Sequence, residues 1–173
     1  MIIFETERLL VRQFTTDDQD NFYRINSHPK VMEYIRPVKN QEETDHFLKL
    51  NIEQYNTEPK YGRWAAIEKS TGIAVGSFAI IPIEGTAKMQ VGYALMPEYW
   101  GKGYATELAR SGVHYFFGNT VIDVVYAVAE QPNTASENVL FKVGFTISGY
   151  RMEEGKKLIE YSLGREKFMQ SNK

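Results

Sequence analysis

The stretch that most constrains the fold is GYALMPEYWGKGYATELARS, which spans Gly92–Ser111. An apolar strand is expected to end near Leu95, because Pro97 cannot continue a strand ladder. A glycine-spaced turn, Gly101–Gly103, then opens directly into a helical pattern. The apolar face of that helix is made by Ala105, Leu108, Ala109, Gly112 and Phe116. The chain must therefore pass from a strand into a helix through a short glycine loop.

This loop predicts an anion site, for which a diphosphate is the natural ligand. The first turn of a helix leaves backbone N–H groups unpaired, and glycines let the backbone approach a ligand without Cβ clashes. A tight strand-to-helix connection also favours glycine for steric reasons alone, so both interpretations stay open. Two other nucleotide motifs are excluded. A P-loop needs Ser or Thr where Gly103 stands, and a dinucleotide fingerprint needs glycine where Thr106 stands.

Length and composition indicate one globular domain over residues 1–170, followed by a polar tail at 171–173. The chain has 173 residues, of which 43% are hydrophobic. A net charge of -2 without a basic run argues against a nucleic-acid or membrane partner. The absence of cysteine excludes disulfides and a cysteine nucleophile. The start, MIIFETERLL, lacks the basic opening of a signal peptide, so a soluble, cytoplasmic protein is expected. A monomer and a homodimer both stay open.

The order of the predicted elements indicates an α/β fold. The predicted strands are 8–14, 61–68, 73–83, 87–95, 122–129, 146–153 and 157–163. The predicted helices are 15–27, 31–35, 41–57, the helix after the glycine loop, and 134–143 with its stop at Gly144. The strand over 122–129 is too apolar to have one face in water and should be central. We therefore expect a mixed, mostly antiparallel sheet of six or seven strands with helices on both faces.

Four segments together resemble the GNAT superfamily of N-acetyltransferases, and in particular its branch of ribosomal-protein serine and alanine N-acetyltransferases. They are ETERLLVRQF near the start, VGYALMPEYWGKGYATEL in the middle, NTASENVLFKVGF later and EYSLGREKF near the end. Their order across nearly the whole chain is far more specific than the glycine loop alone. The resemblance implies a GNAT-like fold and an enzyme that uses acetyl-CoA as co-substrate.

The resemblance also implies which residues bind acetyl-CoA. Backbone groups of Leu95 and Met96 would bind the pantetheine arm and the thioester oxygen, where two neighbouring strands splay apart. Asn133 would reach the pantetheine arm. Lys142 would lie near the adenosine phosphates, although a solvated lysine at a helix end is an equal alternative. The residues that would hold the diphosphate are Trp100, Gly101, Lys102, Gly103, Tyr104, Ala105 and Thr106. The family pattern has Gln or Arg where Trp100 stands, so a backbone contact is expected there.

Two catalytic residues are implied in the same way. Many relatives protonate the CoA thiolate with a tyrosine, but Leu140 occupies that position here. Ser136 is therefore the candidate acid, with a helix-start hydroxyl bonded to backbone as the alternative. Glu154 is the candidate base that removes the amine proton, with Glu153 or water as alternatives. A third alternative is that Glu154 is an exposed hairpin carboxylate without a catalytic role. Relatives often carry Glu at the position of Gln90, so this chain has no acid there.

The expected function is direct transfer of the acetyl group from acetyl-CoA to a protein N-terminal α-amine in a ternary complex. One alternative acceptor is a small amine, such as a polyamine, an amino acid derivative or an aminoglycoside. An alternative function is that the chain only binds acyl-CoA and is catalytically silent. The acceptor cleft is expected among the N-terminal helices. No metal is expected, because His28, His46 and His114 are scattered without ligand spacing.

Overall fold

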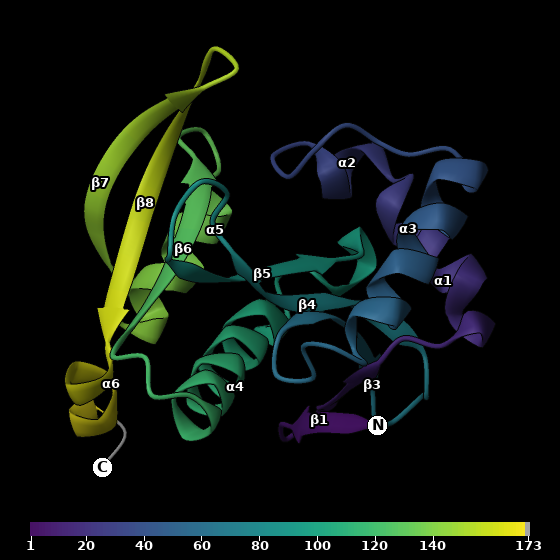
Figure 1. The fold of residues 1–173 in the computed structure, drawn as a ribbon, viewed down its shortest axis with the longest axis horizontal. Coiled ribbons are helices and arrows are strands. Elements are labelled where there is room, and N and C mark those ends of the chain that lie inside the picture. Colours follow the sequence, from purple (N-terminus) through teal and green to yellow (C-terminus); the bar gives the residue numbers. More distant parts are fainter. Residues whose placement is uncertain (172–173) are drawn as a thin grey trace.

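The computed structural model describes residues 1–171, which are built around one eight-stranded sheet (Figure 1). The strand order is β1-β2-β3-β4-β5-β6-β8-β7. Neighbouring strands are antiparallel except β5 and β6, which are parallel. The strands are β1 (Ile2–Glu5), β2 (Leu9–Gln13), β3 (Gly62–Glu68), β4 (Ala74–Pro82), β5 (Met89–Leu95), β6 (Val124–Glu130), β7 (Thr146–Glu153) and β8 (Lys156–Gly164). The mixed, mostly antiparallel sheet predicted from the sequence is confirmed.

The number of strands is larger than the predicted six or seven, because β1 adds an edge strand. It has four residues and pairs with β2 through Phe4↔Val11 and Glu5↔Leu10. A strand of this length spans only two residues on each face, which is too few to show an alternating pattern. The expectation that the strand predicted at 122–129 is central is confirmed, since β6 lies between β5 and β8.

Helices cover both faces of the sheet, as predicted. Phe22 of α1 and Leu48 of α3 pack with Ala65 on one face, whereas Trp64 belongs to the core on the side of α4, α5 and α6. Successive side chains of β3 therefore enter opposite layers. The helices are α1 (Gln19–Asn26), α2 (Pro29–Met32), α3 (Gln41–Gln54), α4 (Tyr104–Asn119), α5 (Thr134–Val143) and α6 (Arg165–Ser171), with short 3-10 turns η1 (Thr16–Asp18) and η2 (Pro97–Tyr99).

Several predicted boundaries can be compared with the structure. Helix α5 has the predicted bounds and stops at Gly144, whose φ of 113° is left-handed. Helix α3 ends at Gln54 rather than at residue 57. Of the predicted polar tail, Ser171 is the last residue of α6, and residues 172–173 lie outside the described residues. Over residues 1–171, no helix combines the length and the hydrophobicity needed to cross a membrane.

The feature that positions the site is the divergence of β5 and β6. Within the described residues the two strands pair only at Gln90↔Tyr126. They therefore separate toward Leu95 and Glu130, at their carboxyl ends. The prediction that two neighbouring strands splay apart beside Leu95 is consistent with this geometry. In Figure 1 the tip of the β7–β8 hairpin and α2 lie at the same edge of the molecule as this opening.

The packing of α4 on the sheet depends on Gly112. A Cβ added there would lie 2.0 Å from Cζ of Phe78, whose ring is fully buried. Gly112→Ala should therefore lower the free energy of unfolding by about 1–3 kcal/mol, as overpacked core positions do. Gly118 is the matched control in the same helix, because its Cβ would meet no atom within 4 Å.

Gly118→Ala should instead stabilise the protein by about 0.5–1 kcal/mol, because alanine loses less backbone freedom in a helix. Denaturant unfolding of both variants measures the two effects. Equal stability of the two variants would contradict the close packing of α4 on Phe78.

Candidate active site

A cavity of about 920 Å³ opens where β5 and β6 diverge. Its walls come from the end of β5, the glycine loop, the starts of α4 and α5, the β7–β8 turn and the segment that follows α2. The predicted site residues that line it are Leu95, Trp100, Gly101, Gly103, Tyr104, Ala105, Thr106, Asn133, Ser136, Lys142 and Glu154. Segments that are far apart in the sequence therefore meet at one opening.

The structure does not bring Met96 or Lys102 into this cavity wall. The N–H of Met96 donates to the carbonyl of Val75, and its own carbonyl accepts from the N–H of Tyr99, both at 2.9 Å. The N–H of Met96 is thus not available to the thioester oxygen, whereas its carbonyl oxygen keeps a second lone pair, so a contact with the pantetheine arm stays a prediction. Lys102 points its Nζ at the ring of Tyr99, 5.1 Å from its centre, and its carbonyl accepts a hydrogen bond from Arg8.

Leu95 is the residue at the end of β5 whose N–H remains available. Alternate N–H groups of an antiparallel strand point to opposite sides, and the N–H of Met96 is bonded to β4. The N–H of Leu95 therefore points away from β4, toward the opening beside β6. Its carbonyl accepts a hydrogen bond of 2.7 Å from the indole N–H of Trp100. The Trp100 side chain thus fixes the loop to the strand end, which is a role that the sequence did not indicate.

The glycine loop has the backbone geometry that an anion site requires. Gly101 and Gly103 have φ values of 73° and 82°, in the left-handed region that favours glycine. Among residues 1–171, no acceptor is found for the N–H groups of residues 101–106. Six successive N–H groups at a helix start can together bind a diphosphate.

The loop is held in place by Arg8 and Glu107. The carboxylate of Glu107 accepts hydrogen bonds from the N–H of Arg8 at 2.8 Å and from its Nε at 2.7 Å. Arg8 also donates to the carbonyl of Lys102 and lies 4.3 Å from the ring centre of Tyr104. Burial alone would raise the pKa of Glu107, but hydrogen bonds from Thr6 and Arg8 bring it below its usual value. The loop is therefore preorganised.

Ser136 lies in the first turn of α5 beside a hydroxyl that the sequence analysis missed. Its Oγ is 3.2 Å from Oη of Tyr93, a residue of β5. Asn133, not Ser136, caps the helix, because its Oδ1 accepts from the N–H of Ser136 at 3.1 Å. The Ser136 hydroxyl therefore does not cap the helix, which was the alternative to a catalytic role. Leu140, at the position of the family tyrosine, is buried in the core.

Tyr93 keeps its phenolic proton at neutral pH and can therefore donate a hydrogen bond. Burial raises the pKa of Tyr93 to about 12, against a smaller lowering by its hydrogen bond with Ser136. Its side chain lies two residues before Leu95, and so on the same face of β5. The alternation of side chains along β5 could have indicated this position, because it places Tyr93 on the face that the following helices cover.

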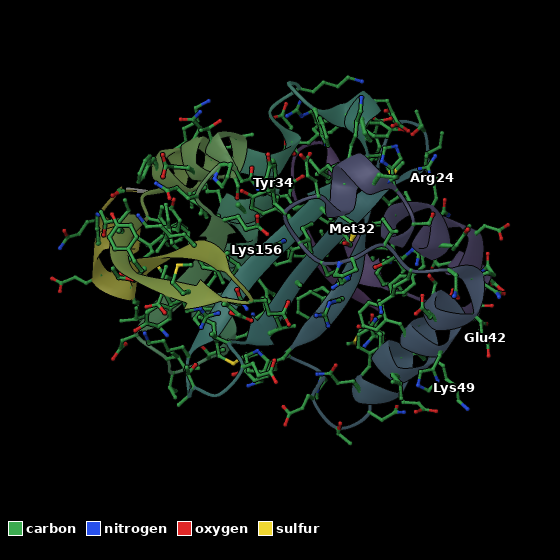
Figure 2. The ribbon with its side chains drawn as sticks, turned by 90° about the horizontal axis from the view of Figure 1, so that it is seen from above. Arg24, Met32, Tyr34, Glu42, Lys49 and Lys156 are labelled. Carbon is green, nitrogen blue, oxygen red and sulfur yellow. The ribbon has the colours of Figure 1, made fainter. Side chains whose placement is uncertain are left out.

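Glu154 occupies the turn between β7 and β8 with an unusual backbone. Its φ is 50°, and it is followed by Gly155 with φ of 76°, as in a tight hairpin. Glu153 and Glu154 both line the cavity, but Glu153 forms an ion pair of 3.1 Å with Arg151. Seen from above, Lys156 of this hairpin and Tyr34, which follows α2, both lie near the middle of the molecule (Figure 2).

Comparisons with known proteins agree with this fold. The sequence model of the acetyltransferase (GNAT) domain matches residues 8–146. Two relatives from Bacillus subtilis are the uncharacterized protein YkkB, 31% identical over 83% of this chain and 84% of its own, and the uncharacterized N-acetyltransferase YoaA, 27% identical over 85% and 84%.

Two solved structures are similar to this chain. An acetyltransferase of the GNAT family from Bacillus anthracis has a TM-score of 0.83 and 26% identity, over 96% of this chain and 99% of its own. A spermidine N-acetyltransferase from Vibrio cholerae, solved with CoA and spermine, has a TM-score of 0.76 and 18% identity over 94% and 98%, which shows a common fold. Together with the glycine loop and the diverging strands, these findings show that the chain belongs to the GNAT family of acetyltransferases.

Proposed function

We propose that this acetyltransferase transfers the acetyl group of acetyl-CoA directly to a protein N-terminal α-amine. The observation that carries the proposal is that one cavity is shared by the elements expected to hold the two substrates. The glycine loop and Leu95 line one part of it, and the β7–β8 turn and the segment after α2 line another. Both substrates can therefore meet in one ternary complex, where their reactive groups are held in place before reaction. The resemblance to the ribosomal-protein branch supports an α-amine as acceptor.

The chemistry follows from the groups around the cavity. The amine nitrogen attacks the thioester carbonyl carbon, and the carbonyl oxygen gains negative charge that the N–H of Leu95 would stabilise. The C–S bond then breaks, and the CoA sulfur leaves as a thiolate. Ser136, held by Tyr93, would donate a hydrogen bond or proton to that sulfur. The proton lost by the amine would pass to Glu154 through water. The free N–H groups of residues 101–106 would hold the CoA diphosphate.

Replacement of Glu154 tests the base. A peptide α-amine has a pKa near 8, so about a tenth of it is neutral at pH 7 and help from a base is useful but modest. Glu154→Gln should therefore shift the pH dependence of kcat/KM to higher pH. With an alkyl amine, whose pKa is near 10, the loss at pH 7 should be more severe.

Glu153→Gln is the matched comparison, because this neighbouring carboxylate lines the same cavity but is paired with Arg151. The measurement is kcat/KM against pH for the parent and both variants. An unchanged profile for Glu154→Gln would remove Glu154 from the mechanism.

The acceptor class is tested with a panel of peptides, polyamines and aminoglycosides, while free CoA is followed. Turnover of the peptides alone is the expected result. Turnover of spermidine or an aminoglycoside instead would replace the protein N-terminus with a small amine. CoA binding without turnover of any acceptor would favour a silent acyl-CoA-binding protein.

A further inference from the structure

Two guanidinium groups lie together in the part of the cavity wall formed by the N-terminal half of the chain. Arg36 follows α2 and Arg63 belongs to β3, and both line the cavity. Their Cζ atoms lie 4.9 Å and 5.1 Å from the centre of the same ring, that of Phe47 in α3. Residues from three separate elements therefore bring two positive charges to one place.

These two charges have no acidic partner in the part of the chain that the structure describes. Neither Arg36 nor Arg63 forms an ion pair there. Arg36 donates one hydrogen bond, from Nη2 to Oδ1 of Asn26 at 2.7 Å, while its Nε is buried without an acceptor. Unpaired guanidinium donors thus remain at the cavity wall.

The carboxylates that line the cavity form no ion pair with Arg36 or Arg63 within residues 1–171. Glu130 is bound to Lys156 at 2.5 Å, and Glu153 to Arg151 at 3.1 Å. Glu33 lines the cavity too, but it is exposed and forms no ion pair within residues 1–171. Glu154, the proposed base, lines the cavity as well and likewise forms no ion pair there. No carboxylate of the described chain is therefore bonded to either guanidinium.

Such an arrangement is costly without a ligand. Arg36 and Arg63 are half-buried without an acidic partner among the described residues, and two like charges near each other add repulsion. Burial, together with the nearby charge of Arg63, lowers the pKa of Arg36 to about 10, so Arg36 still carries its charge at neutral pH. An anion bound between the two guanidiniums would relieve both costs. The planar fork of arginine matches a carboxylate in particular.

We propose that the acceptor is a primary amine that also carries a carboxylate, and that Arg36 and Arg63 bind this carboxylate. The inference rests on the proposed acetylation of an amine in this cavity. The same two charges repel polycationic amines, so they select against polyamines and aminoglycosides. The carboxylate can come from an acidic side chain next to a peptide N-terminus or from the carboxyl group of a small amino acid derivative.

Matched acceptors test this selectivity in the parent protein. One pair consists of peptides that begin with serine and carry either aspartates or asparagines at the next two positions. The other pair is a small amino acid derivative with a free carboxylate and its amide. In at least one pair, kcat/KM should be about 10-fold or more higher for the carboxylate form, and the preference should fall as salt rises. The pair that responds identifies the source of the carboxylate.

Titration calorimetry of the same four compounds against the protein with CoA bound tests the anion site without turnover. Tighter binding of the carboxylate forms with no turnover of any compound would contradict the proposed function but retain the anion site. Equal binding and equal turnover of carboxylate and amide forms would overturn the inference. Faster turnover of spermidine than of any carboxylate acceptor would overturn it as well.

Variants of the two arginines locate the site. Arg36→Gln and Arg63→Gln should each reduce the preference for the carboxylate form by about 10-fold. Lys39→Gln is the matched control, because the Lys39 Nζ also faces the ring of Phe47, at 5.7 Å, but Lys39 does not line the cavity. CoA affinity, measured by calorimetry, shows that each variant is folded. A preference that survives in both arginine variants, or that Lys39→Gln removes equally, would overturn the assignment.

Discussion

Gly101→Val should weaken the binding of CoA by about 100-fold or more. The φ of 73° at Gly101 is strained for valine, so the loop would turn to another conformation and move its N–H groups. Hydrogen bonds to a charged group contribute about 1.5–3 kcal/mol each, and the loss of two of them accounts for a change of this size. Titration calorimetry with CoA measures it.

Gly72→Val is a control with the same backbone strain. Gly72 has φ of 71°, and an added Cβ would meet no atom within 4 Å at either glycine. Gly72 lies in a turn outside the cavity. Both variants should lose similar stability, but only Gly101→Val should lose CoA affinity. If both bound CoA as tightly as the parent, the diphosphate would not lie on this loop.

Ser136→Ala should lower kcat by about 10- to 100-fold and leave the affinity for acetyl-CoA nearly unchanged. The reason is that a hydroxyl beside the sulfur acts as the thiolate leaves, and not in the ground state. Ser136→Thr keeps the hydroxyl and should restore part of the activity. Equal kcat in Ser136→Ala and the parent would leave Ser136 without a catalytic role.

Tyr93 should act through Ser136 as a positioning residue. Because the two oxygens are 3.2 Å apart, Tyr93→Phe should also lower kcat, and the double variant should be no worse than Ser136→Ala alone. Tyr126→Phe is the control, since Tyr126 lies on the neighbouring strand β6 outside the cavity. Additive losses from the two replacements would show that Tyr93 and Ser136 act independently.

The strand, loop and helix around Gly101 could be predicted because their signals are local. Strand alternation, glycines at left-handed positions and helical periodicity all lie within about 20 residues of sequence. The same holds for α5, which ends at a left-handed Gly144. These elements fix where the cavity opens, so most of the predicted site residues do line it.

Other features depend on contacts that no local pattern contains. The pairing of Tyr93 with Ser136 joins residues 43 positions apart, and Arg36 meets Arg63 only through α3 and β3. For a similar reason, the sequence could not show that the N–H of Met96 is occupied. Its N–H is taken by Val75 of β4, and that register is decided by the pairing of whole strands.

The most direct test of direct transfer in one cavity is the fate of the acetyl group. The protein is incubated with acetyl-CoA, with and without a peptide that begins with serine followed by aspartates. The masses of the peptide and the protein are measured by mass spectrometry while CoA release is followed. The account predicts one acetyl group on the peptide α-amine for each CoA released, and an unmodified protein when the peptide is left out. Accumulation of an acetylated protein, or CoA release without acetylated peptide, would contradict it.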